Sequence, residues 1–266
     1  MTKSHQSGAN QLTLTGFFLF SLLLSWSISI PLALIQAGLI PPLLPGWTHY
    51  LSYLGPLIAA LILTGVELGR SGMKDLGKRM LIRRICPRWW VTALLPLFSS
   101  YLIIKILNRM SGAELSLQQI FRAPYLPEIG FWTLLVWILS AGMGGETGWR
   151  GYALPRLQKR FSAFSSALIL AGAWAVWHIP QFFYFLDPAS LPVWMVGLTA
   201  GSVVLTWLYN SAVDSIPTTA IWVGSWQFLT ASAGSDFNLT GVLTAFIAAW
   251  AVLVVILHKP KNLMSI

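Results

Sequence analysis

Long apolar runs recur along the whole chain and leave it few ways to fold. A helix that crosses the hydrocarbon core of a bilayer needs about 20 mostly apolar residues. Eight segments of the 266-residue sequence approach that length and composition: 12–35, 49–68, 89–108, 130–149, 162–186, 191–210, 216–233 and 239–258. The sequence therefore predicts an all-α membrane protein, a bundle of about eight transmembrane helices. We expect residues 1–266 to form a single transmembrane domain.

The overall composition agrees with this fold class. Hydrophobic residues make up 56% of the chain, charged residues make up 9%, and the mean hydropathy is +0.68. A soluble domain carries about 25% charged residues. The single cysteine, Cys86, leaves no partner for an internal disulfide. The composition therefore excludes a disordered chain, a disulfide scaffold and an ordinary soluble enzyme.

The basic residues lie between the apolar runs and set the expected orientation. Three clusters lie at one predicted end of the bundle: Arg70, Lys74, Lys78, Arg79, Arg83, Arg84 and Arg88; Arg156, Lys159 and Arg160; Lys259 and Lys261. Arg109 and Arg122 are exceptions. Cytoplasmic connections are enriched in lysine and arginine. We therefore expect both termini on the cytoplasmic side, and we expect the membrane to be a bacterial plasma membrane. The net charge of +9 then reflects topology and not nucleic-acid binding. An anionic-lipid site in the first cluster is the alternative.

One dense group of small and polar residues, 144–152, lies within an apolar region. Glu146 and Arg150 are four residues apart, which places them on one helix face with the glutamate on the N-terminal side. His178 follows on the next predicted helix. At 1.5 Å per residue, Glu146 and His178 lie about 21 Å and about 25 Å from the connection between the two helices. We therefore expect similar depths, although Pro155 should kink or break the first helix.

A carboxylate and an imidazole that meet inside a bilayer suit a metal site or a proton-transfer pair. Each residue also has a structural interpretation. Glu146 and Arg150 can form an ion pair that holds helices together, because a charge at membrane depth needs a partner or a cavity. His178, close to Trp174 and Trp177, can be a core residue among packing aromatics.

The residues around these positions extend into two longer motifs. The first reads GETGWRGYALPRL over 145–157, and the second reads WAVWHIP over 174–180. Together with TWLYN at 206–210, they resemble the CPBP family of intramembrane metalloproteases. That family includes CAAX prenyl proteases and bacteriocin-processing or immunity proteins. The resemblance covers a core of about 130–230.

The resemblance implies a membrane-embedded endopeptidase with a cavity open toward the cytoplasm. In the family, a glutamate activates water, and histidines from two helices with an asparagine bind the metal or the oxyanion. Carried over to this sequence, Glu146 is the catalytic base, His178 is a ligand or acid, and Arg150 positions Glu146. His178 and Glu146 are the candidate ligands of zinc or another divalent metal. The implied substrate is a hydrophobic or transmembrane peptide.

The chain departs from the family pattern at three positions. Gly145 replaces the first glutamate of the usual E-E-x-x-x-R motif, and in the third motif, H-x-x-x-N, the histidine falls at Val223 and the asparagine at Gln227. A catalytic zinc takes about three protein ligands. Two hypotheses therefore remain open. The chain is an endopeptidase with a shifted, incomplete catalytic set, or it is a metal-free pseudoprotease that binds a hydrophobic peptide or membrane partner in an immunity or regulatory role.

Overall fold

A computed structural model describes residues 2–81, 85–111, 123–127, 129–233 and 237–265 of the chain. Its α-helices are α1 (Thr2–Gln36), α2 (His49–Ser52), α3 (Leu54–Met80), α4 (Pro87–Ser111), α6 (Trp132–Trp137), α7 (Leu154–Gln158), α8 (Ala163–His178), α9 (Leu191–Ser211), α10 (Ile216–Ala233) and α11 (Phe237–His258). Two π-helical segments, η2 (Ile138–Gly145) and η3 (Thr147–Ala153), join α6 to α7. Three short 3₁₀ turns are η1 (Gly46–Thr48), η4 (Ile179–Phe183) and η5 (Pro188–Ser190). These described residues contain no β-strand, which confirms the all-α prediction.

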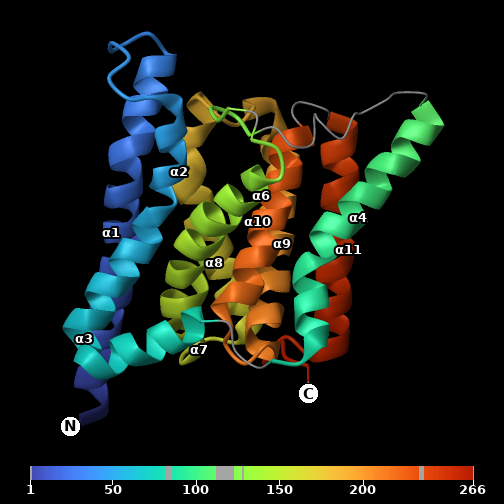
Figure 1. Ribbon diagram of the computed structural model, residues 1–266. Coiled ribbons are helices and arrows are strands. Elements are labelled where there is room, and N and C mark those ends of the chain that lie inside the picture. Colours follow the sequence, from blue (N-terminus) through green and yellow to red (C-terminus); the bar gives the residue numbers. More distant parts are fainter. Residues whose placement is uncertain (1, 82–84, 112–122, 128, 234–236, 266) are drawn as a thin grey trace.

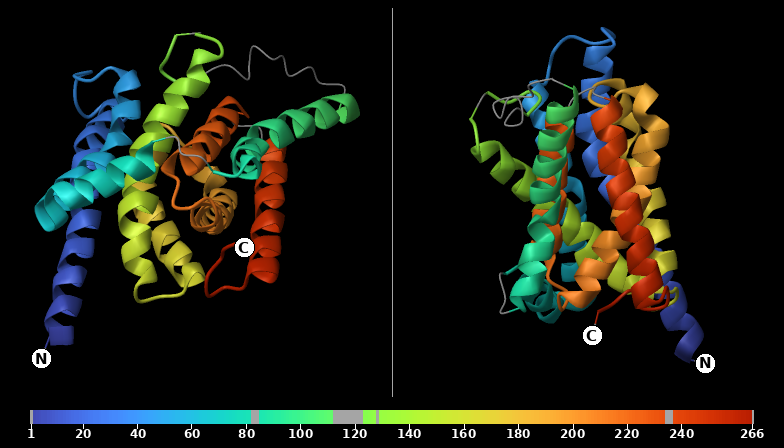
Figure 2. Two further views of the ribbon diagram at one scale, coloured as in Figure 1. Left: turned by 60° about the horizontal axis from the view of Figure 1, so that its bottom comes forward. Right: turned by 90° about the vertical axis from the view of Figure 1, so that its right-hand side faces the viewer.

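The long helices form a bundle in which successive segments run in alternating directions (Figure 1). Helix α1 packs along α3 at one side of the bundle, and α9 packs against both α8 and α11. Both ends of the chain lie at the same end of the bundle, at the bottom of Figure 1, and the right-hand view in Figure 2 agrees.

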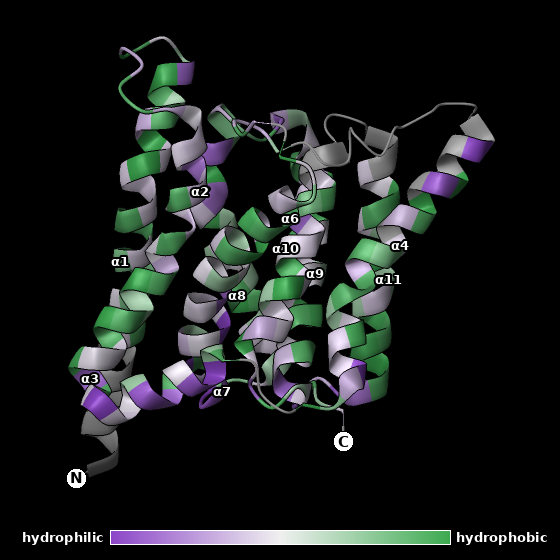
Figure 3. Cartoon of the chain, in the orientation of Figure 1, coloured by the Kyte–Doolittle hydropathy of each residue, from purple (hydrophilic) through white to green (hydrophobic). Residues whose placement is uncertain are grey.

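Five helical segments are long and apolar enough to cross a membrane. They are Thr13–Gln36, Gly46–Met80, Ala163–Phe183, Pro188–Ser211 and Thr240–His258. In Figure 3 the cartoon of the long helices is mostly green and white, the colours of apolar and intermediate residues. The chain is therefore an integral membrane protein. The predicted count of eight spans is not confirmed. The predicted span 216–233 coincides with α10, but threonine, serine and glutamine lower its hydropathy. The span 130–149 is divided between α6 and the π-helical segments.

Helix α3 changes direction at Gly69 and then continues to Met80. Gly69 has φ 58° and ψ −148°, a backbone conformation that is essentially restricted to glycine. The predicted spans 49–68 and 89–108 leave 69–88 as the connection between them, and this connection is helical up to Met80. After the bend, the helix runs across the lower end of the bundle, where Figure 3 shows it strongly polar. In this part of α3, the Leu76 side chain is buried, while Lys74 and Lys78 are exposed.

The final turn of α3 is tied to the bundle by Arg79. Its Nη1 donates to the Gly151 carbonyl at 2.7 Å and to the Tyr209 hydroxyl at 2.8 Å. The basic segment that the sequence interpreted as a topological signal is thus also a structural element. It closes the bundle over the lower ends of η3 and α9.

Glycines make the π-helical segments pack closely against their neighbours. A methyl group on Gly148 would lie 2.5 Å from Cβ of Pro56, so η3 and α3 approach as closely as backbones can. Pro155 does not break the helical segment here. It lies in the first turn of α7, where a proline leaves no hydrogen bond unmade. The irregular geometry falls before it, in η2 and η3.

Candidate functional site

A cavity of about 420 Å³ lies between η2, η3, α8, α9, α10 and the first turns of α11. Most of its lining is apolar. Six tryptophans from four helical segments contribute: Trp149, Trp174, Trp177, Trp194, Trp222 and Trp226. Ligand pockets combine an apolar wall with a few polar groups that orient the ligand. The polar residues of this wall include His178, Gln227 and hydroxyl side chains.

His178 lies on the cavity wall because α8 ends there. Helix α8 begins behind Ser162, whose hydroxyl caps the backbone N–H of Ser165 at 3.1 Å. It ends because Pro180 disfavours a continued helix and the chain tightens into the 3₁₀ turn η4. The His178 ring is 93% buried, and its Nδ1 lies 2.7 Å from the Trp174 carbonyl oxygen.

That contact fixes the protonation of the neutral His178 ring. A carbonyl oxygen only accepts hydrogen bonds, so Nδ1 carries the proton and Nε2 is left as an acceptor. Metal-ligating histidines are oriented in this way, and so are histidines that accept a hydrogen bond from a ligand. Trp177 and Trp194 hold the ring by edge contacts, with centroid distances of 4.6 Å and 5.1 Å.

The three positions that depart from the family pattern line the same cavity as His178. Gly145 comes from η2, and Val223 and Gln227 come from α10. The motif spacing therefore predicted which residues converge, although it gave no geometry for them. A Cβ on Gly145 would meet Trp149 at 3.6 Å, an ordinary contact, so the site has room for a larger residue there.

Glu146 points elsewhere. Its side chain is fully buried, and its Oε1 accepts a hydrogen bond from Nη1 of Arg150 at 2.8 Å. Arg150 is equally buried. It donates to the Ser202 hydroxyl at 3.2 Å and stacks over the Trp174 ring at 4.1 Å. Thr219 of α10 also contacts Glu146. The pair therefore joins η3 to three helices behind the cavity wall.

This placement separates Glu146 from His178. Gly145 lines the cavity and Glu146 does not, because consecutive residues of a helix point in different directions. The structural interpretation of Glu146 and Arg150 as an ion pair matches the observed contacts. A catalytic or metal-binding role for Glu146, Arg150 or His178 stays a prediction.

His49 packs against a residue of the cavity wall, and the sequence did not identify it as a site residue. Its ring is buried, stacks on Phe185 at a centroid distance of 4.0 Å and places Nδ1 2.8 Å from the Tyr184 hydroxyl. Phe185 in turn lines the cavity. The sequence placed His49 at the very start of a span, a position that carries no signal of burial. The tryptophans of the wall were interpreted as packing residues. The four-residue spacing of Trp222 and Trp226 was the one sequence signal for this wall, because residues four apart lie on one face of a helix.

The donor set does not fit a catalytic metal. Zinc takes about three ligands from His, Cys, Asp and Glu. Within the described residues, no three such side chains are grouped closely enough to hold an ion. Of the four positions that the family motifs bring together, only His178 offers a strong ligand. Gln227 offers an amide oxygen, which transition metals bind weakly.

Comparisons with known proteins agree with the motifs. Residues 127–229 match the family model described as type II CAAX prenyl endopeptidase, Rce1-like. Over these residues the chain is similar to the CAAX prenyl protease family. A curated relative, CAAX prenyl protease 2 of Methanococcus maripaludis, is 24% identical over 165 residues. These residues cover 58% of this chain and 60% of the relative. The chain thus matches less than two thirds of the relative's length. The match to the family model includes the cavity positions of η2, α8 and α10.

Proposed function

We propose that this chain is a membrane pseudoprotease, which binds a short hydrophobic peptide segment in the cavity and does not cleave it by metal catalysis. One observation carries the proposal. Gly145, His178, Val223 and Gln227 line one apolar cavity, and only one of them is a strong metal ligand. Compared with the family pattern, the chain has a cavity at these positions but fewer side chains that could bind a metal ion or activate water. An immunity or regulatory role toward a membrane partner follows from such binding.

The wall of the cavity suits an apolar peptide. Six indole rings offer large apolar faces, and a volume of about 420 Å³ accommodates a few aliphatic side chains. His178 Nε2 accepts a hydrogen bond from a peptide N–H, and the Gln227 amide both donates and accepts. Backbone groups that enter a membrane cavity need such partners, because an unsatisfied amide in apolar surroundings costs about 2–7 kcal/mol.

A metal-dependent endopeptidase is the second candidate, and the orientation of His178 favours it. The contact of Nδ1 with the Trp174 carbonyl leaves Nε2 without a proton, as a metal ligand would require. In that function, His178 and Gln227 would contact the ion, Arg150 would orient Glu146, and Glu146 would serve as the base after a change of side-chain direction. The metal would supply polarisation of the scissile carbonyl. The fully buried contacts of Glu146 with Arg150 speak against this second candidate.

Peptide binding and peptide cleavage can be measured in one experiment. The purified chain is placed in lipid nanodiscs and titrated with a short leucine-rich peptide that carries a bromophenylalanine. Bromine quenches nearby tryptophans, so binding next to the six indoles lowers their fluorescence. We expect saturable quenching that zinc or a chelator leaves unchanged, and intact peptide by mass spectrometry. Cleavage that a chelator abolishes would refute the proposal.

A matched pair of glycine substitutions locates the bound peptide. Gly201 lines the cavity, and its Cβ position is in ordinary contact with the Trp222 ring at 3.8 Å. Gly201→Leu therefore fills part of the cavity, and we expect the peptide affinity to fall by about tenfold, in line with burial of one leucine side chain. Gly172→Leu on the exposed face of α8 should leave the affinity unchanged. Equal affinities for the two variants would place the binding elsewhere.

A further inference from the structure

The cavity is closed at mid-depth and open at one end of the bundle. The lining residues from η2, η3 and the middle of α9, which include Gly145, Trp149 and Leu205, are buried. Among the described lining residues, only Asp187 and Ala189 are exposed. Both lie in the connection between α8 and α9. The mouth of the cavity is therefore at the end where α8 stops and α9 begins.

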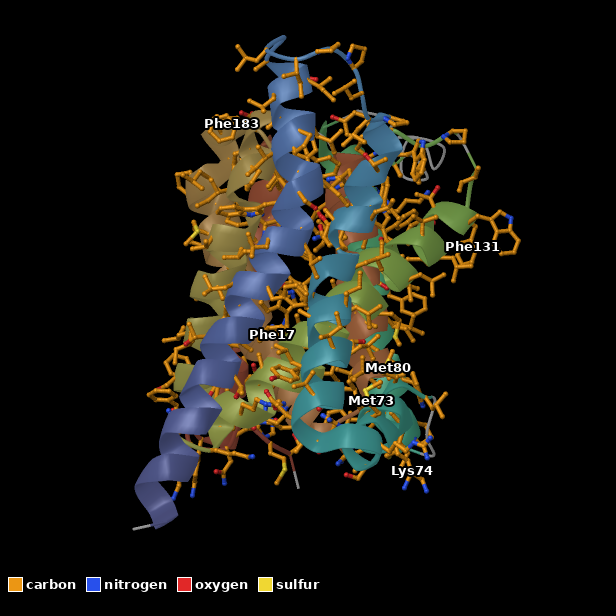
Figure 4. The ribbon with its side chains drawn as sticks, turned by 90° about the vertical axis from the view of Figure 1, so that its left-hand side faces the viewer. Phe17, Met73, Lys74, Met80, Phe131 and Phe183 are labelled. Carbon is orange, nitrogen blue, oxygen red and sulfur yellow. The ribbon has the colours of Figure 1, made fainter. Side chains whose placement is uncertain are left out.

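That end is opposite the part of the molecule that carries most of the positive charge. We call the lower end of the bundle in Figure 1 the basic face. The last turns of α3, the start of α4, the connection from α7 to α8 and the residues after α11 lie there. Among the described residues, the exposed cations of these segments are Arg70, Lys74, Lys78, Arg88, Lys159, Arg160, Lys259 and Lys261. In Figure 4, Lys74 lies near the lower end and Phe183, the last residue of η4, near the upper end. Among the residues that the structure describes, Lys105 and Arg109 of α4 are exposed cations nearer the upper end.

The positive-inside rule assigns the basic face to the cytoplasm. The mouth then opens to the other side of the membrane. The family resemblance implied a cavity open toward the cytoplasm, so the charge distribution and the cavity of this chain point the opposite way from that expectation.

The mouth has a defined rim and one carboxylate side chain. The Tyr50 hydroxyl donates to the Pro124 carbonyl at 2.8 Å, and the Tyr125 hydroxyl donates to the Tyr184 carbonyl at 2.7 Å. Asp187 projects from this rim as the one acidic or basic side chain, apart from His178, among the described residues of the lining. Its Oδ1 accepts a hydrogen bond from the Ala189 N–H at 2.9 Å. The Asp187 carboxylate therefore lies at the outer end of a cavity whose lining is mostly apolar.

We propose that the cavity is entered from the extracytoplasmic side and selects an apolar peptide segment whose outer end carries a positive charge, paired with Asp187. This inference deepens the proposed function and rests on it. Apolar side chains would occupy the tryptophan-lined interior, and a lysine or a free amino group would lie at the rim. An ion pair at the edge of a low-dielectric cavity is stronger than one in bulk water.

The entry side can be tested with the chain's own cysteine. Cys86 is exposed on the basic face, and Ala189→Cys adds a second thiol at the mouth. Cells that express this variant are treated with a membrane-impermeant maleimide. We expect position 189 to be labelled in intact cells and Cys86 only after permeabilisation. The reverse pattern, or labelling of both positions only after permeabilisation, would overturn the entry side.

The charge preference is tested with two peptides that differ in one group. Both are the short brominated leucine-rich peptide, ending either in lysine amide or in norleucine amide. We expect wild type to bind the lysine peptide about fivefold more tightly, and Asp187→Asn to remove this preference. The expected difference in affinity is no larger because an exposed ion pair contributes about 1 kcal/mol or less. Asn keeps the oxygen that caps Ala189, so the rim should stay intact.

The outcomes separate this inference from the function on which it rests. Equal binding of both peptides by wild type would overturn the charge selection and leave peptide binding in place. An equal loss of affinity for both peptides in Asp187→Asn would show a structural role for the residue and contradict the pairing. Failure of wild type to bind either peptide would overturn both the inference and the proposed function.

Discussion

The triple variant Gly145→Glu, Val223→His and Gln227→Asn is expected to gain a zinc ion. All three positions line the cavity that His178 lines. The variant thus offers two imidazoles and a carboxylate around one space, close to the three ligands that a catalytic zinc takes. Metal analysis after dialysis should give about one zinc per chain, a saturated site for a set of three ligands. Cleavage of the peptide in the same preparation would show that the scaffold still supports hydrolysis.

The control for this variant removes the histidine that the chain already has. Adding His178→Ala to the triple variant should abolish zinc binding while leaving the tryptophan fluorescence of the folded protein in place. A folded triple variant that holds no zinc would contradict the convergence of the four positions. Gly145→Glu alone tests the steric premise. The 3.6 Å contact with Trp149 predicts that this variant folds.

Replacing Arg150 with alanine is expected to be the most destabilising single substitution at the site. Glu146 would be left as an unpaired charge in a fully buried position. Removing one partner of such a pair costs about 3–5 kcal/mol of unfolding free energy. The loss of the Ser202 hydrogen bond and of the stacking on Trp174 adds to it. Unfolding followed by tryptophan fluorescence in detergent should show the loss as a large fall in midpoint.

Two further variants separate the ion pair from any role in chemistry. Asp75 and Arg79 have the same four-residue spacing, but the Asp75 side chain is 65% exposed. Asp75→Ala should cost less than about 1 kcal/mol, as exposed pairs do. The double substitution Glu146→Gln with Arg150→Met removes both charges and should restore much of the stability. If the double variant unfolds as easily as Arg150→Ala, burial of an unpaired charge is not the cause.

The sequence predicted the fold class and the approximate positions of several long helices, because these depend on local composition. The motif spacing also identified Gly145, Val223 and Gln227 as counterparts of family site positions, and these residues line one cavity with His178. The apolar run 216–233 coincides with α10, and the basic segments lie at one end of the bundle. The bend at Gly69 was not predicted. It depends on a positive φ that a glycine allows but does not require.

The direction of Glu146 could not be predicted, and this direction decides the chemistry. The motif spacing assumed a regular α-helix, whereas the chain is π-helical on both sides of Glu146. Gly145 faces the cavity and Glu146 faces Arg150, because consecutive residues of a helix point in different directions. The spacing alone did not decide between a Glu146 paired with Arg150 and a Glu146 that meets His178. The tryptophan wall and the buried His49 arise from tertiary packing of segments far apart in the sequence, which local patterns do not encode.

The most direct test of the central claim is the zinc affinity of the wild-type chain beside that of His178→Ala. Both proteins are equilibrated with zinc in nanodiscs, and bound metal and peptide cleavage are measured on the same samples. A cavity with a single strong ligand predicts the same weak zinc binding for both proteins and an intact peptide. Tight binding of zinc by wild type, lost together with peptide cleavage in His178→Ala, would contradict the account.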